Sequence, residues 1–350
     1  MIITLAADAP TSTSAALLDA ASALRKPART MPDGLGGLIV AIDGSLPDDL
    51  LHGPGIRGVH RQHRPYVLAS REHRERTVVT VGDVRIGGKD PVVMAGPCSI
   101  EGRDSLLRAA HAVRAAGADI LRGGAFKPRT SPYSFQGLGE NGLRYLAEAR
   151  EQTGMPVITE VMEPDQVDLV AEYADIVQIG TRNMSNYPLL RRVGQLRKPV
   201  LLKRGMSARV EEWLMSAEYI LAGGNMEVIL CERGIRSFDP ATRFTLDLAA
   251  VPLARQLTHL PIIVDPSHGT GVRSLVGSMA VAGIAAGADG IFVEAEPNPE
   301  QATSDAAQTI DPDELYEIVR RSRLVAEAMA VQLSQPLAHE EVRDLASVAD

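Results

Sequence analysis

The chain has 350 residues, of which 45% are hydrophobic and 23% are charged, a composition typical of a globular protein and too apolar for a disordered one. Its formal net charge of −8 argues against a nucleic acid as the main partner, because binding a polyanion requires a basic surface. Two cysteines, Cys98 and Cys231, and no secretory leader or long apolar run exclude a disulfide framework and a membrane span, so we expect a cytoplasmic protein.

Residues 1–63 are predicted to form a small separate domain, because short apolar runs lie there among many Ala, Pro and His residues. Strands are expected at 2–5, 37–42 and 56–60, and helical segments at 14–24 and 48–51. This order suggests a ferredoxin-like α+β domain. The polar segment 64–76 is expected to be a linker.

From Thr77 onward, strand-length apolar runs alternate with helix-length segments. A hairpin is predicted over 77–88, with its turn at VGDV, and helices are predicted at 105–117, 143–154, 210–224 and 273–287. The eight predicted strands lie at 92–99, 119–125, 156–161, 175–180, 199–205, 227–234, 261–268 and 290–296. This α/β pattern predicts a (β/α)8 TIM barrel over 77–331, followed by a tail over 332–350. The alternative, an open doubly wound sheet, is disfavoured because no GxGxxG turn follows the first strand.

Three potential metal ligands follow strands that become neighbours when the barrel closes. Cys98, His268 and Glu294 come after strands one, seven and eight, and Asp305 in the next loop can supply a fourth donor. Each residue alone is explained by burial or by solvation. Their shared position at the C-terminal end of the barrel instead indicates one divalent ion. The mixed sulfur, nitrogen and oxygen set suits Mn²⁺, Fe²⁺, Co²⁺ or Zn²⁺ better than Mg²⁺ or Ca²⁺.

Five cations are expected to point into the same mouth of this acidic protein. They are Arg122, Lys127, Arg182, Lys203 and Arg233. Burying several like charges together is costly unless anions neutralise them, so the substrate should carry phosphate and carboxylate. The loop KPRTS over 127–131 offers donors for a second phosphate, although an ordinary basic turn would read the same way. Other polar residues near strand ends are Glu160, Arg204, Glu232, Arg236, Asp265 and Glu296.

At these positions the chain resembles the 3-deoxy-D-arabino-heptulosonate-7-phosphate (DAHP) synthases, specifically the type I-beta branch. The resemblance covers about residues 64–330 and is carried by AGPCSIEGRD, LRGGAFKPRTSPYSFQGLGENG, VQIGTRN, PVLLKRG, ILCERGIRSF, DPSHGTG and VEAEPNPEQATSD. It implies condensation of phosphoenolpyruvate with erythrose 4-phosphate, the first step of the shikimate pathway. It also implies a divalent metal, Mn²⁺ foremost with Fe²⁺, Co²⁺ or Zn²⁺ as alternatives.

The resemblance assigns a role to each candidate residue. The metal ligands are Cys98, His268, Glu294 and Asp305. Phosphoenolpyruvate is held by Arg122, Lys127, Arg182, Lys203 and Arg233, while Arg129 and Thr130 bind the phosphate of erythrose 4-phosphate. Lys127 is the candidate general acid at the aldehyde oxygen, and His268 or Glu160 is expected to steer protons or water.

Two other functions compete with this interpretation. The sister 3-deoxy-octulosonate-8-phosphate synthases use arabinose 5-phosphate, and their substrate loop reads KANRS where this chain has KPRTS. Alternatively, the barrel is inactive and residues 1–63 act as an amino-acid-binding module, which the intact metal set argues against. By resemblance we expect feedback inhibition by Tyr or Phe through residues 1–63, and a homotetramer or homodimer.

Overall fold

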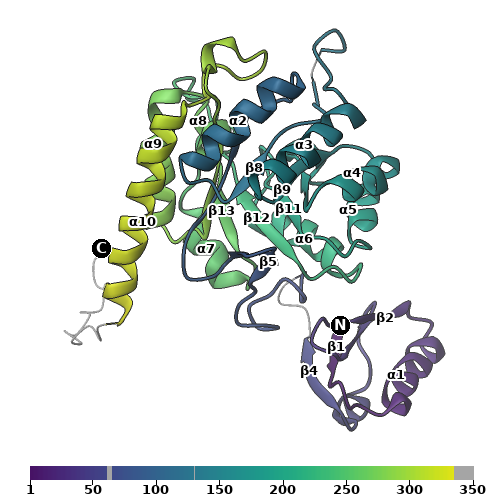
Figure 1. The fold of residues 1–350 in the computed structure, drawn as a ribbon. Coiled ribbons are helices and arrows are strands. Elements are labelled where there is room, and N and C mark those ends of the chain that lie inside the picture. Colours follow the sequence, from purple (N-terminus) through teal and green to yellow (C-terminus); the bar gives the residue numbers. More distant parts are fainter. Residues whose placement is uncertain (61–64, 130, 335–350) are drawn as a thin grey trace.

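The computed structural model describes residues 1–60, 65–129 and 131–334 (Figure 1). Three of the predictions fall partly outside the described residues. These are the phosphate ligand Thr130, the linker at its first residue, Arg64, and the tail over residues 335–350. No helix among the described residues is long and apolar enough to cross a bilayer.

The N-terminal unit is one antiparallel sheet with a helix on it, as predicted. Its elements are β1 (Ile2–Leu5), α1 (Thr11–Ala23), β2 (Ala28–Pro32), β3 (Leu38–Ile42), the 3-10 turn η1 (Asp48–His52) and β4 (Ile56–His60). The strand order β2-β3-β1-β4 is that of a ferredoxin-like sheet, with η1 in the place of the second helix. Ile3, Leu5, Leu17 and Val40 form its small core. Strand β2 was not predicted, because its sequence ARTMP has a single long apolar residue and lies at the sheet edge.

The rest of the described chain is a closed barrel of parallel strands surrounded by helices, which confirms the predicted fold. The strands are β7 (Val92–Gly96), β8 (Ile120–Arg122), β9 (Val157–Val161), β10 (Ile176–Ile179), β11 (Val200–Lys203), β12 (Val228–Glu232), β13 (Ile262–Val264) and β14 (Gly290–Glu294). Each lies inside one of the eight predicted segments. Pairing of β14 with β7 closes the barrel and brings Glu294 level with Gly96, two residues before Cys98.

Helices fill the intervals between strands. They are α2 (Arg103–Ala115), α3 (Glu140–Thr153), α4 (Val167–Tyr173), α5 (Tyr187–Val193), α6 (Val210–Leu221), α7 (Ala250–Leu257), α8 (Pro266–Thr270), α9 (Arg273–Ala285) and α10 (Pro312–Ser334). Short 3-10 turns occur at η2 (Pro164–Gln166), η3 (Thr181–Asn183) and η4 (Pro299–Gln301). The large core lies between strands and helices, which explains why the strands are apolar on both faces.

A hairpin of β5 (Val79–Val81) and β6 (Val84–Ile86) closes the N-terminal end of the barrel. Val79, Val81 and Ile86 belong to one apolar cluster with the side chains inside the barrel. That cluster reaches Phe292 on β14, whose ring centroid lies 4.1 Å from the Lys203 ammonium and 5.0 Å from the Arg122 guanidinium. The barrel interior is therefore packed from the hairpin up to Phe292, and the cations begin directly above this ring.

One carboxylate on α6 ties the segment after β4 to the barrel. The Glu218 carboxylate accepts hydrogen bonds from the backbone N–H groups of Val67, Leu68 and Ala69, at 3.0, 2.9 and 2.8 Å. His259, which follows α7, holds the same segment through Nε2, 2.6 Å from the Leu68 carbonyl oxygen. These contacts fix where the N-terminal unit leaves the barrel.

Candidate active site

A cavity of about 340 Å³ lies at the C-terminal ends of the barrel strands. Its lining includes every described cation that the sequence predicted for substrate binding: Arg122, Lys127, Arg129, Arg182, Lys203 and Arg233. Glu160, His268 and Asp305 line it as well. Thr130, the remaining predicted phosphate ligand, lies outside the described residues.

Three of the four predicted metal ligands converge beside this cavity. The donor atoms of Cys98, Glu294 and Asp305 all lie within 4.8 Å of one another. The fourth, His268, is adjacent, because its Nε2 lies 3.3 Å from Glu294 Oε1 and 4.0 Å from Asp305 Oδ2. The loop that carries Asp305 is tied to the Cys98 loop by Thr303, whose backbone N–H donates to the Glu101 carboxylate at 2.7 Å.

The electrostatics of this cluster fit a cation. Burial, followed by the nearby Glu294, raises the pKa of the Cys98 thiol to about 12. Burial opposes ionisation of Asp305 too, but His268 and then Arg243 lower its pKa to about 2. A buried carboxylate, a partly buried one and a thiol face one point here, and the two carboxylates are stable together only when positive charge balances them. A divalent ion there would also favour the Cys98 thiolate.

His268 is oriented by a buried carboxylate. Asp265, which follows β13, accepts from the His268 backbone N–H at 2.9 Å and lies 2.8 Å from Nδ1 of the same ring. Because Nδ1 faces this carboxylate, Nε2 is left to face Glu294 and Asp305. Asp265 also pairs with the Lys203 ammonium at 2.5 Å. Although burial opposes it, His268 and Lys203 hold the pKa of Asp265 far below its usual range.

The cations of the cavity make ion pairs and ring contacts, and two of them also have buried donor atoms without a partner among the described residues. Arg122 pairs with Glu294 Oε1 at 3.0 Å, and Lys127 Nζ lies 3.0 Å from Cys98 Sγ, so both reach the edge of the metal-ligand cluster. The Nε atoms of Arg122 and Arg233 are buried without a hydrogen-bond partner. Arg233 packs its guanidinium 4.1 Å from the centroid of Phe244, and burial lowers its pKa. Unused buried donors in a cationic cavity indicate an anionic ligand.

The rim of the cavity carries Arg129, which is expected to bind the phosphate of erythrose 4-phosphate, and also Arg182 and Glu160. Arg129 donates from Nε to the Phe135 carbonyl at 3.0 Å, which leaves its terminal nitrogens available. Arg182 is exposed, and its Nη1 lies 3.5 Å from the Pro128 carbonyl oxygen. Glu160 accepts from Gln178 Nε2 at 3.0 Å. Residues 127–129 therefore meet Arg182, which follows β10, at the opening of the cavity.

Some polar strand-end residues lie outside this site. Arg204 and Glu232 are buried and pair with each other at 2.8 Å, and Arg204 also pairs with Asp247 at 2.9 Å. They brace the loops instead of lining the cavity. Glu296 does not line the cavity either, and burial, followed by Glu101, raises its pKa to about 7.

Gln178, Arg243 and Gln308 are among the polar residues of the site that were not singled out from the sequence. Gln178 and Arg243 line the cavity, and Gln308 donates to Glu294 Oε2 at 2.7 Å. Of these three, only Gln178 could have been found from its position, because it lies inside the predicted strand at 175–180. Arg243 and Gln308 lie deep in loops, far from any strand end in sequence.

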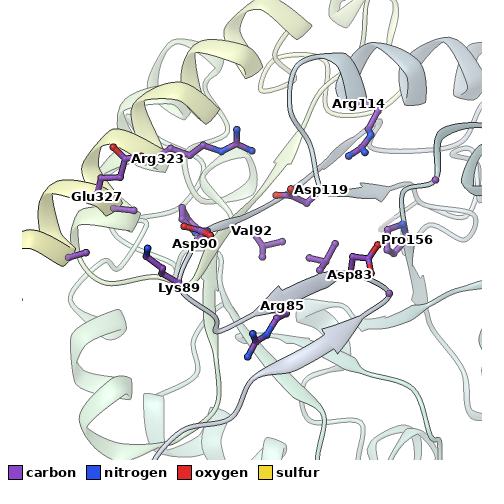
Figure 2. A pocket seen from close by; sticks show the side chains of 16 residues that line it. Asp83, Arg85, Lys89, Asp90, Val92, Arg114, Asp119, Pro156, Arg323 and Glu327 are labelled. Atoms are coloured by element: carbon purple, nitrogen blue, oxygen red, sulfur yellow. The ribbon is translucent and has the colours of Figure 1, made fainter.

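A larger cavity, of about 680 Å³, lies at the opposite end of the barrel (Figure 2). The hairpin, the starts of β7 to β9 and α10 surround it. Figure 2 shows acidic and basic side chains around it: Asp83, Asp90, Asp119 and Glu327 against Arg85, Lys89, Arg114 and Arg323. Because both signs are equally represented, this cavity lacks the excess of basic side chains that lines the smaller one.

Comparison with known proteins gives a consistent result for the barrel. The sequence profile of the DAHP synthetase I family matches residues 68–329. Phospho-2-dehydro-3-deoxyheptonate aldolase from Thermotoga maritima is 53% identical over 280 residues, which cover 80% of this chain and 83% of that relative. A 2-dehydro-3-deoxyphosphooctonate aldolase from Magnetococcus marinus is 32% identical over 277 residues, 73% of this chain and 96% of the relative.

Solved structures agree with the sequence relatives. The crystal structure of the Thermotoga maritima phospho-2-dehydro-3-deoxyheptonate aldolase (DAHP synthase) superposes with a TM-score of 0.76 at 45% identity. It covers 94% of this chain and 97% of its own, so the similarity includes the N-terminal unit. A truncated form of the same enzyme gives a TM-score of 0.71 at 49% identity, over 75% of this chain and 97% of its own.

Proposed function

This chain belongs to the DAHP synthetase I family and condenses phosphoenolpyruvate with erythrose 4-phosphate to give 3-deoxy-D-arabino-heptulosonate 7-phosphate and phosphate, and we propose that it does so as a metal-dependent enzyme. The observation that carries the proposal is the convergence of Cys98, Glu294 and Asp305, with His268 beside them, at the edge of a cationic cavity. The sulfur, nitrogen and oxygen donors suit Mn²⁺, Fe²⁺, Co²⁺ or Zn²⁺, and we propose Mn²⁺ first among them.

We assign the phosphoenolpyruvate site to Arg122, Lys127, Arg182, Lys203 and Arg233. Arg122, Lys127, Lys203 and Arg233 are buried, and Arg122 and Lys203 lie over the Phe292 ring, so a low dielectric strengthens their attraction for phosphate and carboxylate. Arg129 at the rim, together with Thr130, is assigned to the phosphate of erythrose 4-phosphate. We infer that the two reacting carbons meet between these two groups of residues, near the metal-ligand cluster.

When bound, the cation would polarise the aldehyde oxygen of erythrose 4-phosphate as a Lewis acid. We propose that Lys127, whose Nζ lies 3.0 Å from Cys98 Sγ, donates a proton to that oxygen as C3 of phosphoenolpyruvate bonds to the aldehyde carbon. Water then adds to C2, and the resulting hemiketal releases inorganic phosphate. Glu160 keeps an acceptor for that water after its bond from Gln178, and His268 is the alternative proton carrier.

The test is metal content and turnover of the purified enzyme with each aldose. We expect bound divalent metal, loss of turnover in EDTA with recovery on adding Mn²⁺, and preference for erythrose 4-phosphate over arabinose 5-phosphate. The Cys98→Ser variant should bind metal more weakly, while Cys231→Ser, the control at the buried cysteine outside the site, should retain both metal and activity. Full turnover in EDTA would refute metal dependence, and preference for arabinose 5-phosphate would refute the substrate assignment.

We also propose that residues 1–63 form a regulatory domain that binds Tyr or Phe, and that the cytoplasmic enzyme is a homo-oligomer, a tetramer or a dimer. The support is the resemblance of the whole chain to an enzyme solved with its N-terminal unit and the fixed junction at Glu218. Turnover should fall on adding Tyr or Phe, and deletion of residues 1–63 should abolish that inhibition. Inhibition that survives the deletion would contradict the regulatory assignment, and light scattering would measure the oligomer.

A further inference from the structure

We propose that Arg243, acting with Gln308, is a positioning residue that holds the two carboxylate ligands of the metal site in their binding orientation. The inference rests on the proposed metal site and adds residues to it. Arg243 lies in the loop between β12 and α7, far from the ligands in sequence. Its side chain is 42% exposed and lines the cavity, so a substrate-binding cation is the competing assignment.

Each carboxylate ligand uses one oxygen toward the cluster centre and one away from it. Asp305 Oδ2 accepts from the Cys98 thiol at 3.3 Å, while Oδ1 accepts from Arg243 Nη1 at 2.9 Å. Glu294 Oε1 faces His268 Nε2 at 3.3 Å, while Oε2 accepts from Gln308 Nε2 at 2.7 Å. The outward oxygen of each carboxylate is therefore held by the bridge. The inward oxygens face the cluster centre where a cation would bind, and that of Glu294 also pairs with Arg122 at 3.0 Å.

Arg243 and Gln308 form one connected bridge between these outward oxygens. Gln308 is buried, and its Oε1 accepts from Arg243 Nη1 at 3.2 Å while its Nε2 donates to Glu294. These two bonds also fix which way the Gln308 side-chain amide points, because the Arg243 guanidinium can only donate and the Glu294 carboxylate can only accept. Asp305 has a left-handed backbone with φ of 55°, so its placement depends on contacts such as that with Arg243.

The loop that carries Arg243 is docked rigidly against the His268 segment. The Arg243 backbone N–H donates to the Thr270 carbonyl at 2.9 Å, and Ile235 and Thr245 exchange two backbone hydrogen bonds at 2.9 Å each. At Gly271 a Cβ would come within 2.5 Å of Arg243 Cβ, so the two segments approach as closely as a glycine permits. A side chain on such a fixed backbone can position its partners, because it loses little entropy in doing so.

The test measures metal affinity directly, with Co²⁺ as the probe and absorbance of the thiolate–Co²⁺ charge-transfer band as the signal. For Arg243→Gln and Gln308→Met we expect Co²⁺ affinity to fall about 10–100-fold, the usual effect of losing a partner that orients a ligand. Arg243→Lys should recover part of the loss. The double variant should lose less than the sum of the single losses, because both residues belong to one bridge. Gln308 does not line the cavity, so its variant reports on the bridge alone.

Arg255→Gln is the matched control, because Arg255 is 37% exposed and pairs with Asp289 at 3.1 Å at the other end of the barrel. It should bind Co²⁺ as the wild type does. Unchanged Co²⁺ affinity in Arg243→Gln and Gln308→Met would overturn the inference, and a raised KM for phosphoenolpyruvate in Arg243→Gln would then assign Arg243 to substrate binding. If the wild type itself gave no charge-transfer band, the metal site proposed above would fail instead. Circular dichroism in EDTA shows whether each variant is folded.

Discussion

Replacing Asp265 by Asn should destabilise the metal-free barrel strongly, although the two side chains have nearly the same shape. Asp265 is fully buried and is the ion-pair partner of Lys203 among the described residues, and the Lys203 side chain is 5% exposed. Removing one partner of a buried ion pair costs about 3–5 kcal/mol, because the other charge stays buried without compensation. The Phe292 ring, 4.1 Å from Nζ, still stabilises the ammonium, so we expect about 3 kcal/mol.

The assay is urea unfolding in EDTA, followed by the fluorescence of Trp213, the single tryptophan of the chain. Trp213 is fully buried on α6 and donates from Nε1 to the Leu202 carbonyl at 3.1 Å, next to Lys203. Its signal therefore reports on the part of the barrel that the substitution disturbs.

Asp247→Asn provides the comparison. Asp247 is 26% exposed, and its partner Arg204 keeps the Glu232 carboxylate at 2.8 Å, so its loss should cost about 1 kcal/mol or less. A smaller loss in Asp265→Asn than in Asp247→Asn would refute the reasoning that Lys203 depends on a buried counter-charge. Because Asp265 also orients His268, metal affinity should fall with stability in Asp265→Asn and stay unchanged in Asp247→Asn.

Three further outcomes are expected. Glu218→Ala leaves the N–H groups of residues 67–69 without their acceptor, which costs about 1–3 kcal/mol for each buried group. Hydrogen exchange at these three amides should therefore be faster than in the wild type, while exchange in β10 is unaffected. Equal protection of the three amides in the variant and the wild type would contradict the role of Glu218. Gly271→Ala should lower the melting temperature more than Gly154→Ala. Both glycines have φ near +70°, so each variant has a backbone cost of about 1–2 kcal/mol, but of the two only a Cβ at Gly271 would clash with a neighbour within 4 Å. Equal decreases in melting temperature would show that the loop of Arg243 moves to relieve the clash. Burial lowers the pKa of His259 to about 4, so below about pH 6.5 the unfolded chain binds a proton that the folded chain excludes. The free energy of unfolding should therefore fall by about 2 kcal/mol from pH 7 to pH 5. The urea midpoint of His259→Gln should change less than that of the wild type over this range, and an equal change would assign the acid sensitivity to other groups.

The barrel could be predicted because each strand is a short apolar run bounded by turn residues, and the number of runs matched a closed barrel. The prediction of the N-terminal unit was less complete. Strand β2 has little apolar signal of its own and depends on pairing with β3. Its presence is decided by tertiary contacts that local sequence does not record.

The candidate site shows the same limit at the level of side chains. Polar residues at strand ends were found together, but adjacent positions point in opposite directions, so Lys203 reaches the cavity while Arg204 turns to Glu232. Strand position alone did not separate the two. Arg243 and Gln308 could not be found at all, because long loops bring them to Asp305 and Glu294 and neither loop carries a periodic pattern.

The hairpin β5–β6 has a consequence for traffic through the enzyme. It seals one end of the barrel and packs the interior up to Phe292, so molecules reach the reaction chamber by a single route. We therefore expect a reactant held against the Phe292 floor by Arg122 and Lys203 to be enclosed once a second one occupies the rim, and the sugar product to leave before the floor is refilled. A barrel closed at one end thus predicts an order of substrate binding and product release that does not depend on the relative affinities of the two substrates.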